Sequence, residues 1–302
     1  MPMIGMMASS GAKSDTWKTR TGPTTYTESG AAATYNNIIY TFGGLDTFSA
    51  RTGVTQAYNP ATDTWSSKAT MTRARYNLAG AANPLTGIIY AVGGNSTTSF
   101  MDTYFEAYDT TANTWTSKTA MSVGRRELGA AFADDTSDYI YAIGGYNVGG
   151  TASNANEAYN ITTNTWSSKA NMTTARYGLG VVNNQSNKIF AVGGLGTTGN
   201  ENESYNFTTN TWSSNTAMTT SRSAVQLAAH PGVVDGFFAL GGKNISPGSE
   251  LNTNEYFNGS SWSTKKVIPT VTSLYPAATA TLTGSKYKIY IPGNGNIEYS
   301  IN

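Results

Sequence analysis

Cysteine is absent from the 302 residues of this chain, and histidine occurs only once. Without thiols the chain can form no disulfide framework, no thiolate metal site and no cysteine nucleophile. One imidazole is also too few for a copper centre, which needs several nitrogen ligands. We therefore expect no metal and no other cofactor.

Charged residues are scarce as well, at 12% of the chain, and the formal net charge is +1. The basic residues are dispersed, so nothing indicates the one-signed surface that nucleic acid or an anionic membrane selects. No stretch approaches the roughly 20 apolar residues of a membrane span. The opening segment MPMIGMMASSGAK lacks the basic flank and long apolar region of a secretory signal. We expect no nucleic-acid partner, no membrane partner and no signal peptide.

What the chain does contain is a repeat with a period near fifty residues. Tryptophans recur at intervals of 46 to 51 residues, at Trp17, Trp65, Trp115, Trp166, Trp212 and Trp262. Glycine pairs follow the same period at Gly43-Gly44, Gly93-Gly94, Gly144-Gly145, Gly193-Gly194 and Gly241-Gly242, with Pro292-Gly293 as a degenerate last copy. Regular spacing of this kind is typical of a repeat architecture.

Each repeat divides into four short strands separated by turn residues, as in Asn77–Ala82, Gly87–Val92, Thr103–Tyr108 and Thr114–Ser117. The first strand is rich in alanine and glycine, which suits a crowded position near a common axis. The strand that carries tryptophan should lie at the rim, where large aromatic side chains fill the wider gap between neighbouring blades.

The two ends of the chain complement each other. The first tryptophan segment has no preceding glycine pair, and the last repeat ends at Glu298-Tyr299 without its tryptophan. If the N-terminal segment supplies the outermost strand of the last blade, the ring closes and no long edge stays unpaired. We predict an all-β, six-bladed β-propeller of four-stranded antiparallel blades. Residues 1–13 would be a tail and residues 14–302 one domain, with repeats near 21–69, 70–119, 120–170, 171–216, 217–266, and 267–302 together with 14–20.

These landmarks resemble the kelch repeat, in which a Gly-Gly pair that ends the second strand is followed by a tyrosine and a tryptophan at set distances. The resemblance implies a six-bladed propeller in which the loops between second and third strands share one face with the blade-to-blade loops. The kelch fold hosts enzymes, adaptors and structural proteins, so it does not by itself determine the function.

Four repeats carry an arginine ten residues after the tryptophan, and two interpretations of these arginines stay open. Around an axial channel, four guanidinium groups could clamp a carboxylate or sulfate. Alternatively, each arginine pairs with a third-strand glutamate and ties adjacent blades together, which the matching repeat positions favour. The arginines are Arg75, Arg125, Arg176 and Arg222, the glutamates are Glu106, Glu157, Glu203 and Glu255, and the other two repeats hold Thr27 and Thr272.

The loops that follow the glycine pairs differ in length and sequence while the framework repeats. Variable loops on a rigid scaffold are where binding residues are expected. Aromatic side chains in these loops could anchor a partner or stack on a sugar, or they could fold back over the blades. The candidates are Phe48, Phe100, Tyr104 and Tyr146.

We predict a non-enzymatic binding or structural assembly module with a protein or glycan partner, which could belong to a larger assembly. The low-charge composition, rich in Thr, Asn and Gly, resembles that of phage virion and cell-surface proteins, and favours a virion or extracellular surface over the cytoplasm. The alternative is a carbohydrate-binding protein, or an enzyme that resembles the kelch-type sialic-acid mutarotases. In that case the four arginines would bind the sugar carboxylate and a third-strand glutamate would be the base.

Overall fold

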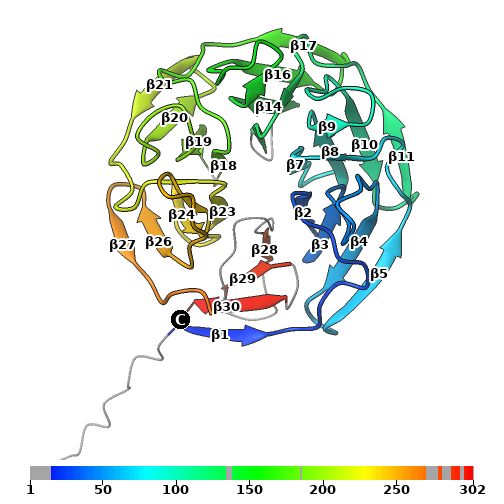
Figure 1. The fold of residues 1–302 in the computed structure, drawn as a ribbon, viewed down its shortest axis with the longest axis horizontal. Coiled ribbons are helices and arrows are strands. Elements are labelled where there is room, and N and C mark those ends of the chain that lie inside the picture. The colour runs from blue at the N-terminus through cyan, green and yellow to red at the C-terminus, as the bar shows by residue number, and fades with distance from the viewer. Residues whose placement is uncertain are drawn as a thin grey trace, which may run out of the picture.

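The computed structural model describes residues 15–133, 138–183, 186–269, 278–280, 287–292 and 296–301. Within these residues every regular element is a β-strand. The strands form six four-stranded antiparallel sheets, arranged as blades around one axis (Figure 1). The expected six-bladed β-propeller is thus confirmed. The expected tail, residues 1–13, and Thr272 lie outside the described residues.

In each blade the strands run from the axis to the rim in chain order, except in the last blade, where β1 takes the outer place. Blade 1 contains β2 (Ala31–Tyr35), β3 (Ile38–Phe42), β4 (Thr55–Asn59) and β5 (Thr64–Lys68). Blade 2 contains β7 (Ala79–Ala82), β8 (Ile88–Val92), β10 (Phe105–Asp109) and β11 (Thr114–Ser117). Blade 3 contains β13 (Gly129–Phe132), β14 (Tyr139–Ile143), β16 (Asn156–Asn160) and β17 (Thr165–Ser168).

The second half of the ring repeats this plan. Blade 4 contains β18 (Gly180–Asn183), β19 (Lys188–Val192), β20 (Asn202–Asn206) and β21 (Thr211–Ser214). Blade 5 contains β23 (Gln226–Ala229), β24 (Gly236–Leu240), β26 (Asn254–Asn258) and β27 (Trp262–Thr264). Blade 6 contains β28 (Ala278–Ala280), β29 (Tyr287–Ile291), β30 (Ile297–Ile301) and β1 (Thr16–Thr19).

Three two-residue ribbons extend blades 2, 3 and 5 beyond their innermost strands, on the face that carries the loops between second and third strands. They are β6 (Arg75–Tyr76) with β9 (Asn95–Ser96), β12 (Arg125–Arg126) with β15 (Tyr146–Asn147), and β22 (Arg222–Ser223) with β25 (Lys243–Asn244). Blades 1 and 4 have single bridges in the equivalent places, Glu28 with Leu45 and Tyr177 with Leu195. We call this side of the molecule the loop face.

The ring is closed by the pairing of β1 with β30, in a register that sets Trp17 opposite Tyr299. Figure 1 shows these two ends of the chain side by side at the rim. The indole Nε1 of Trp17 donates to the carbonyl of Lys266 at 3.1 Å. Each of the other five tryptophans makes the same bond to the preceding blade, at 2.7–3.0 Å. The N-terminal strand therefore closes the ring with the contact that joins every other pair of blades.

The hydrophobic core lies between adjacent blades. Phe42 of blade 1, for example, packs against Trp115 of blade 2 with ring centroids 5.5 Å apart. Near the axis the blades approach so closely that side chains must be small: a Cβ added to Gly129 would lie 2.0 Å from the Cγ2 atom of Val181 in the next blade. These contacts explain the alanine- and glycine-rich first strands and the aromatic outer strands.

Candidate functional site

The four repeat arginines are fully buried and each is paired with the third-strand glutamate of its own blade. The Nη2–Oε2 distances are 2.9 Å for Arg75–Glu106, 2.6 Å for Arg125–Glu157, 2.8 Å for Arg176–Glu203 and 2.5 Å for Arg222–Glu255. All four arginine side chains are 0% exposed. A guanidinium group without exposed surface cannot reach a ligand at the axis. The arginine–glutamate pairing is therefore observed, but within one blade rather than between adjacent blades, and it leaves the guanidinium groups no exposed surface for a carboxylate ligand.

The side chains of these arginines bond within their own blades, and their backbone carbonyls connect adjacent blades. Arg222 donates through Nη1 to the carbonyl of Gly241, in its own blade, at 2.9 Å. The carbonyl of Arg222 accepts from the amide of Gly194, in the preceding blade, at 2.9 Å. Both glycines adopt positive φ, and a Cβ on Gly193 would lie 2.6 Å from that arginine carbonyl. The glycine pair and the arginine thus form one structural unit.

Burial and pairing act in opposite directions on these ions. Desolvation lowers the pKa of Arg75 to about 10, although the attraction of Glu106 raises it. Desolvation likewise lowers the pKa of Arg125, Arg176 and Arg222, partly offset by their glutamates. With a pKa of about 10, the Arg75 guanidinium still carries its proton at neutral pH.

Blade 1 lacks both charges at once. Thr27 stands in the arginine position, and Gln56 stands in the glutamate position. The amide of Gln56 accepts hydrogen bonds from the Thr24 hydroxyl at 2.6 Å and the Thr25 amide at 2.9 Å, and donates to the Thr25 carbonyl at 2.7 Å. A structural ion pair should be present or absent as a whole, because either ion alone would be buried without a partner. The absence of both charges from blade 1 fits this expectation.

Blade 6 has Ile297 in the glutamate position, and its buried carboxylate, Glu298, lies one residue further along β30. Glu298 accepts from Arg20, which follows β1, at 2.6 Å and from Tyr290 at 2.8 Å, and lies 2.8 Å from Lys288. Burial raises the pKa of Glu298, but these three donors outweigh it and hold the pKa below its usual range. Because Arg20 comes from the N-terminal segment, the pair also helps to close the ring.

Two residues beyond the arginine position in blades 1 to 5, the described chain contributes to a second ring that faces the axis. The residues are Ser29, Asn77, Glu127, Gly178 and Ala224, which we call the collar, and their φ angles lie between 51° and 62°. Each collar amide from Asn77 onward donates to the carbonyl of the preceding collar residue, at 2.7–2.8 Å. Four non-glycine residues in the left-handed region are uncommon, and here the blade-to-blade hydrogen bonds impose the conformation.

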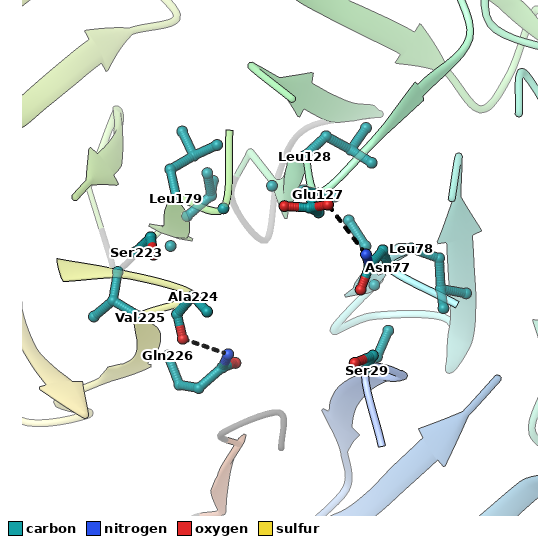
Figure 2. Close-up of a pocket in the computed structure, with 18 of the residues that line it drawn as sticks. Ser29, Asn77, Leu78, Glu127, Leu128, Leu179, Ser223, Ala224, Val225 and Gln226 are labelled. Atoms are coloured by element: carbon teal, nitrogen blue, oxygen red, sulfur yellow. Dashed lines mark hydrogen bonds between the residues drawn. The ribbon is translucent and has the colours of Figure 1, made fainter. Parts of the chain in front are cut away.

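The collar surrounds a cavity of about 470 Å³ on the axis of the propeller, which we call the axial cavity. Figure 2 shows Leu78, Leu128, Leu179 and Val225 directed away from the opening, into the blades. The collar and the innermost strands therefore present mostly small side chains and backbone to the cavity. Its described lining contains one acidic residue, Glu127, and one basic residue, Lys243.

Glu127 is the chemically distinctive collar residue. Its Oε1 atom accepts from the amide of Asn77 at 3.2 Å and lies 3.5 Å from Nε of Arg126. Within the described residues, its Oε2 atom accepts no hydrogen bond, and Gly178 beside it has no side chain to cover it. Desolvation raises the pKa of Glu127, and Arg126, Asn77 and Lys243 offset this only in part.

The aromatic loop residues divide into two groups. Phe48 is 90% exposed and Phe100 is 70% exposed, so these two side chains do not fold back over the blades. Tyr104 lies under Arg73, with 4.1 Å from the guanidinium carbon to the ring centroid, and its hydroxyl is 2.8 Å from Ser117. Tyr146 stacks edge-on against Tyr177 at 4.9 Å. Tyr104 and Tyr146 are held in place, whereas the two phenylalanines project into solvent.

A family model described as the Kelch motif matches residues 29–72 and 136–173. The two matched segments span β2 to β5 of blade 1 and β14 to β17 of blade 3, and contain the glycine pair, tyrosine and tryptophan of each blade. Together with the six-bladed ring this decides the family. The chain is a kelch-repeat propeller.

Among solved structures, the kelch propeller is similar to one titled "Structure of YjhT", with 13% sequence identity and a TM-score of 0.73. The match covers 92% of this chain and 95% of that chain. In all, 806 solved chains match, so likeness of this kind shows the fold and leaves the function open. No curated protein matches the sequence.

Two kinds of feature are absent from the described part of the kelch propeller. None of its residues forms a helix long and apolar enough to cross a membrane. Nor do its His, Asp and Glu side chains form a group of three or more that could hold a metal ion.

Sequence reasoning missed the collar of this kelch propeller because its members share no residue type. The arginine position repeats chemically and so attracts attention, whereas the collar position holds Ser, Asn, Glu, Gly and Ala. The shared property is a backbone angle, which only Asn77 and Gly178 suggest from residue type. Glu127 could have been found by comparing the residues at each repeat position, because it is the one carboxylate at a position that otherwise holds uncharged residues.

Proposed function

We propose that this kelch propeller is a non-enzymatic binding module that engages a protein partner through its loop face. A binding or structural role is what the kelch propeller fold suggests. The observation that carries the proposal is the exposure of apolar side chains on three consecutive blades: Phe48 at 90%, Phe100 at 70% and Val148 at 68%. All three lie in loops between second and third strands, and therefore on one face.

Ordered arginine–tyrosine pairs support the same face as an interface. Arg51 lies over Tyr76, Arg73 over Tyr104 and Arg126 over Tyr146, with guanidinium carbons 5.4, 4.1 and 5.2 Å from the ring centroids. Arginine and tyrosine are enriched in interface hot spots, and side chains that are already ordered lose little entropy on binding. Burial of one exposed phenylalanine would contribute about 1.5–3 kcal/mol.

The test compares two faces of the same molecule. The variant Phe48→Ser/Phe100→Ser removes the loop-face anchors. Leu85→Ser/Val234→Ser is the matched control, because these residues are 65% and 59% exposed in hairpins between first and second strands, at the opposite end of the blades. The native partner, identified by crosslinking in the source, should be lost from the first variant and retained by the second. Loss from the second variant alone would contradict the proposal.

The burial of the four arginines in ion pairs argues against the sialic-acid mutarotase alternative, in which they would bind the sugar carboxylate. This supports the non-enzymatic role. The setting on a virion or an extracellular surface stays a prediction from composition. Sedimentation of the native protein with a particle or a surface fraction would test it.

A further inference from the structure

The axial cavity offers a second place for a ligand, independent of the apolar loop face. It has a volume of about 470 Å³, which lies within the range of small-molecule sites. Polar side chains from separate blades meet at its edge: Asn77 and Glu127 on one side, Gln226 on the other (Figure 2). Convergence of a few polar groups on a preformed cavity is typical of a ligand site.

We infer that the axial cavity is a binding site for a neutral, polyhydroxylated small molecule of the size of a mono- or disaccharide. The collar supplies what hydroxyl groups need. The Oε2 atom of Glu127 is an acceptor that faces the cavity, and the Asn77 amide, whose Nδ2 bonds Glu127 at 3.2 Å, keeps its carbonyl oxygen as a further acceptor. Ser29 adds a hydroxyl that can donate or accept.

The charges of the described lining favour a neutral ligand over an ionic one. Glu127 and Lys243 are of opposite sign, and the lining has no excess of either. The arginines that could have attracted an acidic sugar are consumed in their glutamate pairs. A neutral hydroxyl that donates to Glu127 gains a hydrogen bond to a charged group without adding a charge to the cavity.

The described lining of the cavity includes one aromatic residue, Tyr76, whose ring is held in a fixed orientation. The hydroxyl of Tyr76 accepts from the amide of Asn95 at 3.1 Å, and the Asn95 carbonyl oxygen accepts from Arg51 at 2.9 Å. Arg51 also lies over the Tyr76 ring. A ring held in this way can pack against the C–H groups of a saccharide without losing rotamer freedom on binding.

The collar allows variants that remove side chains without breaking the fold. Glycine adopts a left-handed φ without strain, and Gly178 already occupies the position in blade 4. Glu127→Gly and Asn77→Gly should therefore fold at least as well as the original chain. Ala224→Gly makes the same backbone change where no polar side chain is lost, and is the control.

The experiment measures binding of neutral saccharides, their acidic counterparts and amino sugars to the full chain by calorimetry and ligand-observed NMR. We expect at least one neutral saccharide to bind. Its Kd should rise about tenfold or more in Glu127→Gly, rise less in Asn77→Gly, and stay within about twofold in Ala224→Gly. The proposal is overturned if no neutral saccharide binds, if acidic or amino sugars bind more tightly than neutral ones, or if Glu127→Gly and Ala224→Gly bind alike. Because the loop-face phenylalanines are intact in all these variants, this result is independent of the protein-partner test.

Discussion

The Arg222–Glu255 pair can be replaced by the uncharged arrangement that blade 1 already uses. The exchange Arg222→Thr with Glu255→Gln copies Thr27 and Gln56 into blade 5. Blade 5 is a suitable host because its loop has the same Thr-Thr step: Thr219-Thr220 stands where blade 1 has Thr24-Thr25. Those two threonines satisfy the Gln56 amide in blade 1, so the transplanted glutamine should find equivalent partners.

Each single change should reduce the free energy of unfolding strongly. The double variant should lose much less than the sum of the two single losses. Arg222→Thr leaves Glu255, 0% exposed, without its cation, and Glu255→Gln leaves the buried Arg222 without its anion. Either loss should reduce the free energy of unfolding by about 3–5 kcal/mol. The double variant buries no unpaired ion. It still leaves a cavity and deprives the carbonyls of Gly241 and Thr253 of a donor, so it should cost about as much as one single change. The coupling energy is then about 3–5 kcal/mol.

The assay is denaturant unfolding followed by tryptophan fluorescence and by far-ultraviolet circular dichroism. Coincidence of the two transitions would justify a two-state free energy, and equal slopes would show that the unfolded states are comparable. Additivity of the two single changes within about 0.5 kcal/mol would refute the reasoning, because independent sites add to that accuracy. A double variant less stable than both singles combined would refute it too.

Three further changes test closure, the collar and the axis. Trp17→Ala should reduce the free energy of unfolding by about 2 kcal/mol, because it removes the indole contact that closes the ring, whereas Lys18→Ala, exposed on the same strand, should have little effect. Glu127→Gln should change the pH dependence of stability. The pKa of Glu127 is raised in the folded state, so between the ordinary carboxyl pKa and the raised pKa the folded state holds a proton that the unfolded state has released. The free energy of unfolding should therefore fall as the pH rises through this range. Urea titrations at several pH values should show this fall in the original chain and not in Glu127→Gln. Gly129→Ala should cost about 1–3 kcal/mol because its Cβ would overlap Val181, and addition of Val181→Gly should recover part of that loss in thermal unfolding.

Much of the fold could be predicted because its determinants are chemical and periodic. The tryptophans and glycine pairs have one residue type per position, so their spacing reveals the repeat directly. The mismatch between the two ends of the chain predicted the closure, since β1 supplies what blade 6 lacks. The strand predicted from Thr103 to Tyr108 is observed as β10, from Phe105 to Asp109, because the glutamate-tyrosine step sets its register.

The candidate site was less predictable because it depends on the direction in which each side chain points as well as on its position in the repeat. Arg125 and Glu127 are two residues apart, yet one is buried within its blade and the other lies at the axis. The left-handed angle at Glu127 separates them, and no residue type announces it. The sequence pattern therefore suggested a ring of arginines at the channel mouth, where the structure has the collar.

Repetition itself distinguishes the two rings. A side chain that recurs in four blades, each time with the same buried partner, stabilises the blade that contains it. In blade 1, where the arginine is replaced, its partner is replaced as well. The collar repeats only a backbone conformation and its hydrogen bonds, which leaves the five side chains free to differ. A carboxylate in one copy is not needed for the ring, because serine, glycine and alanine serve there equally well. Desolvation of Glu127 disfavours the charged form of its carboxyl group, and the fold gains no stability from burying that charge. A costly group that the repeat does not require is best explained by something that enters the cavity, and this is why Glu127, rather than the four arginines, is the residue to change first.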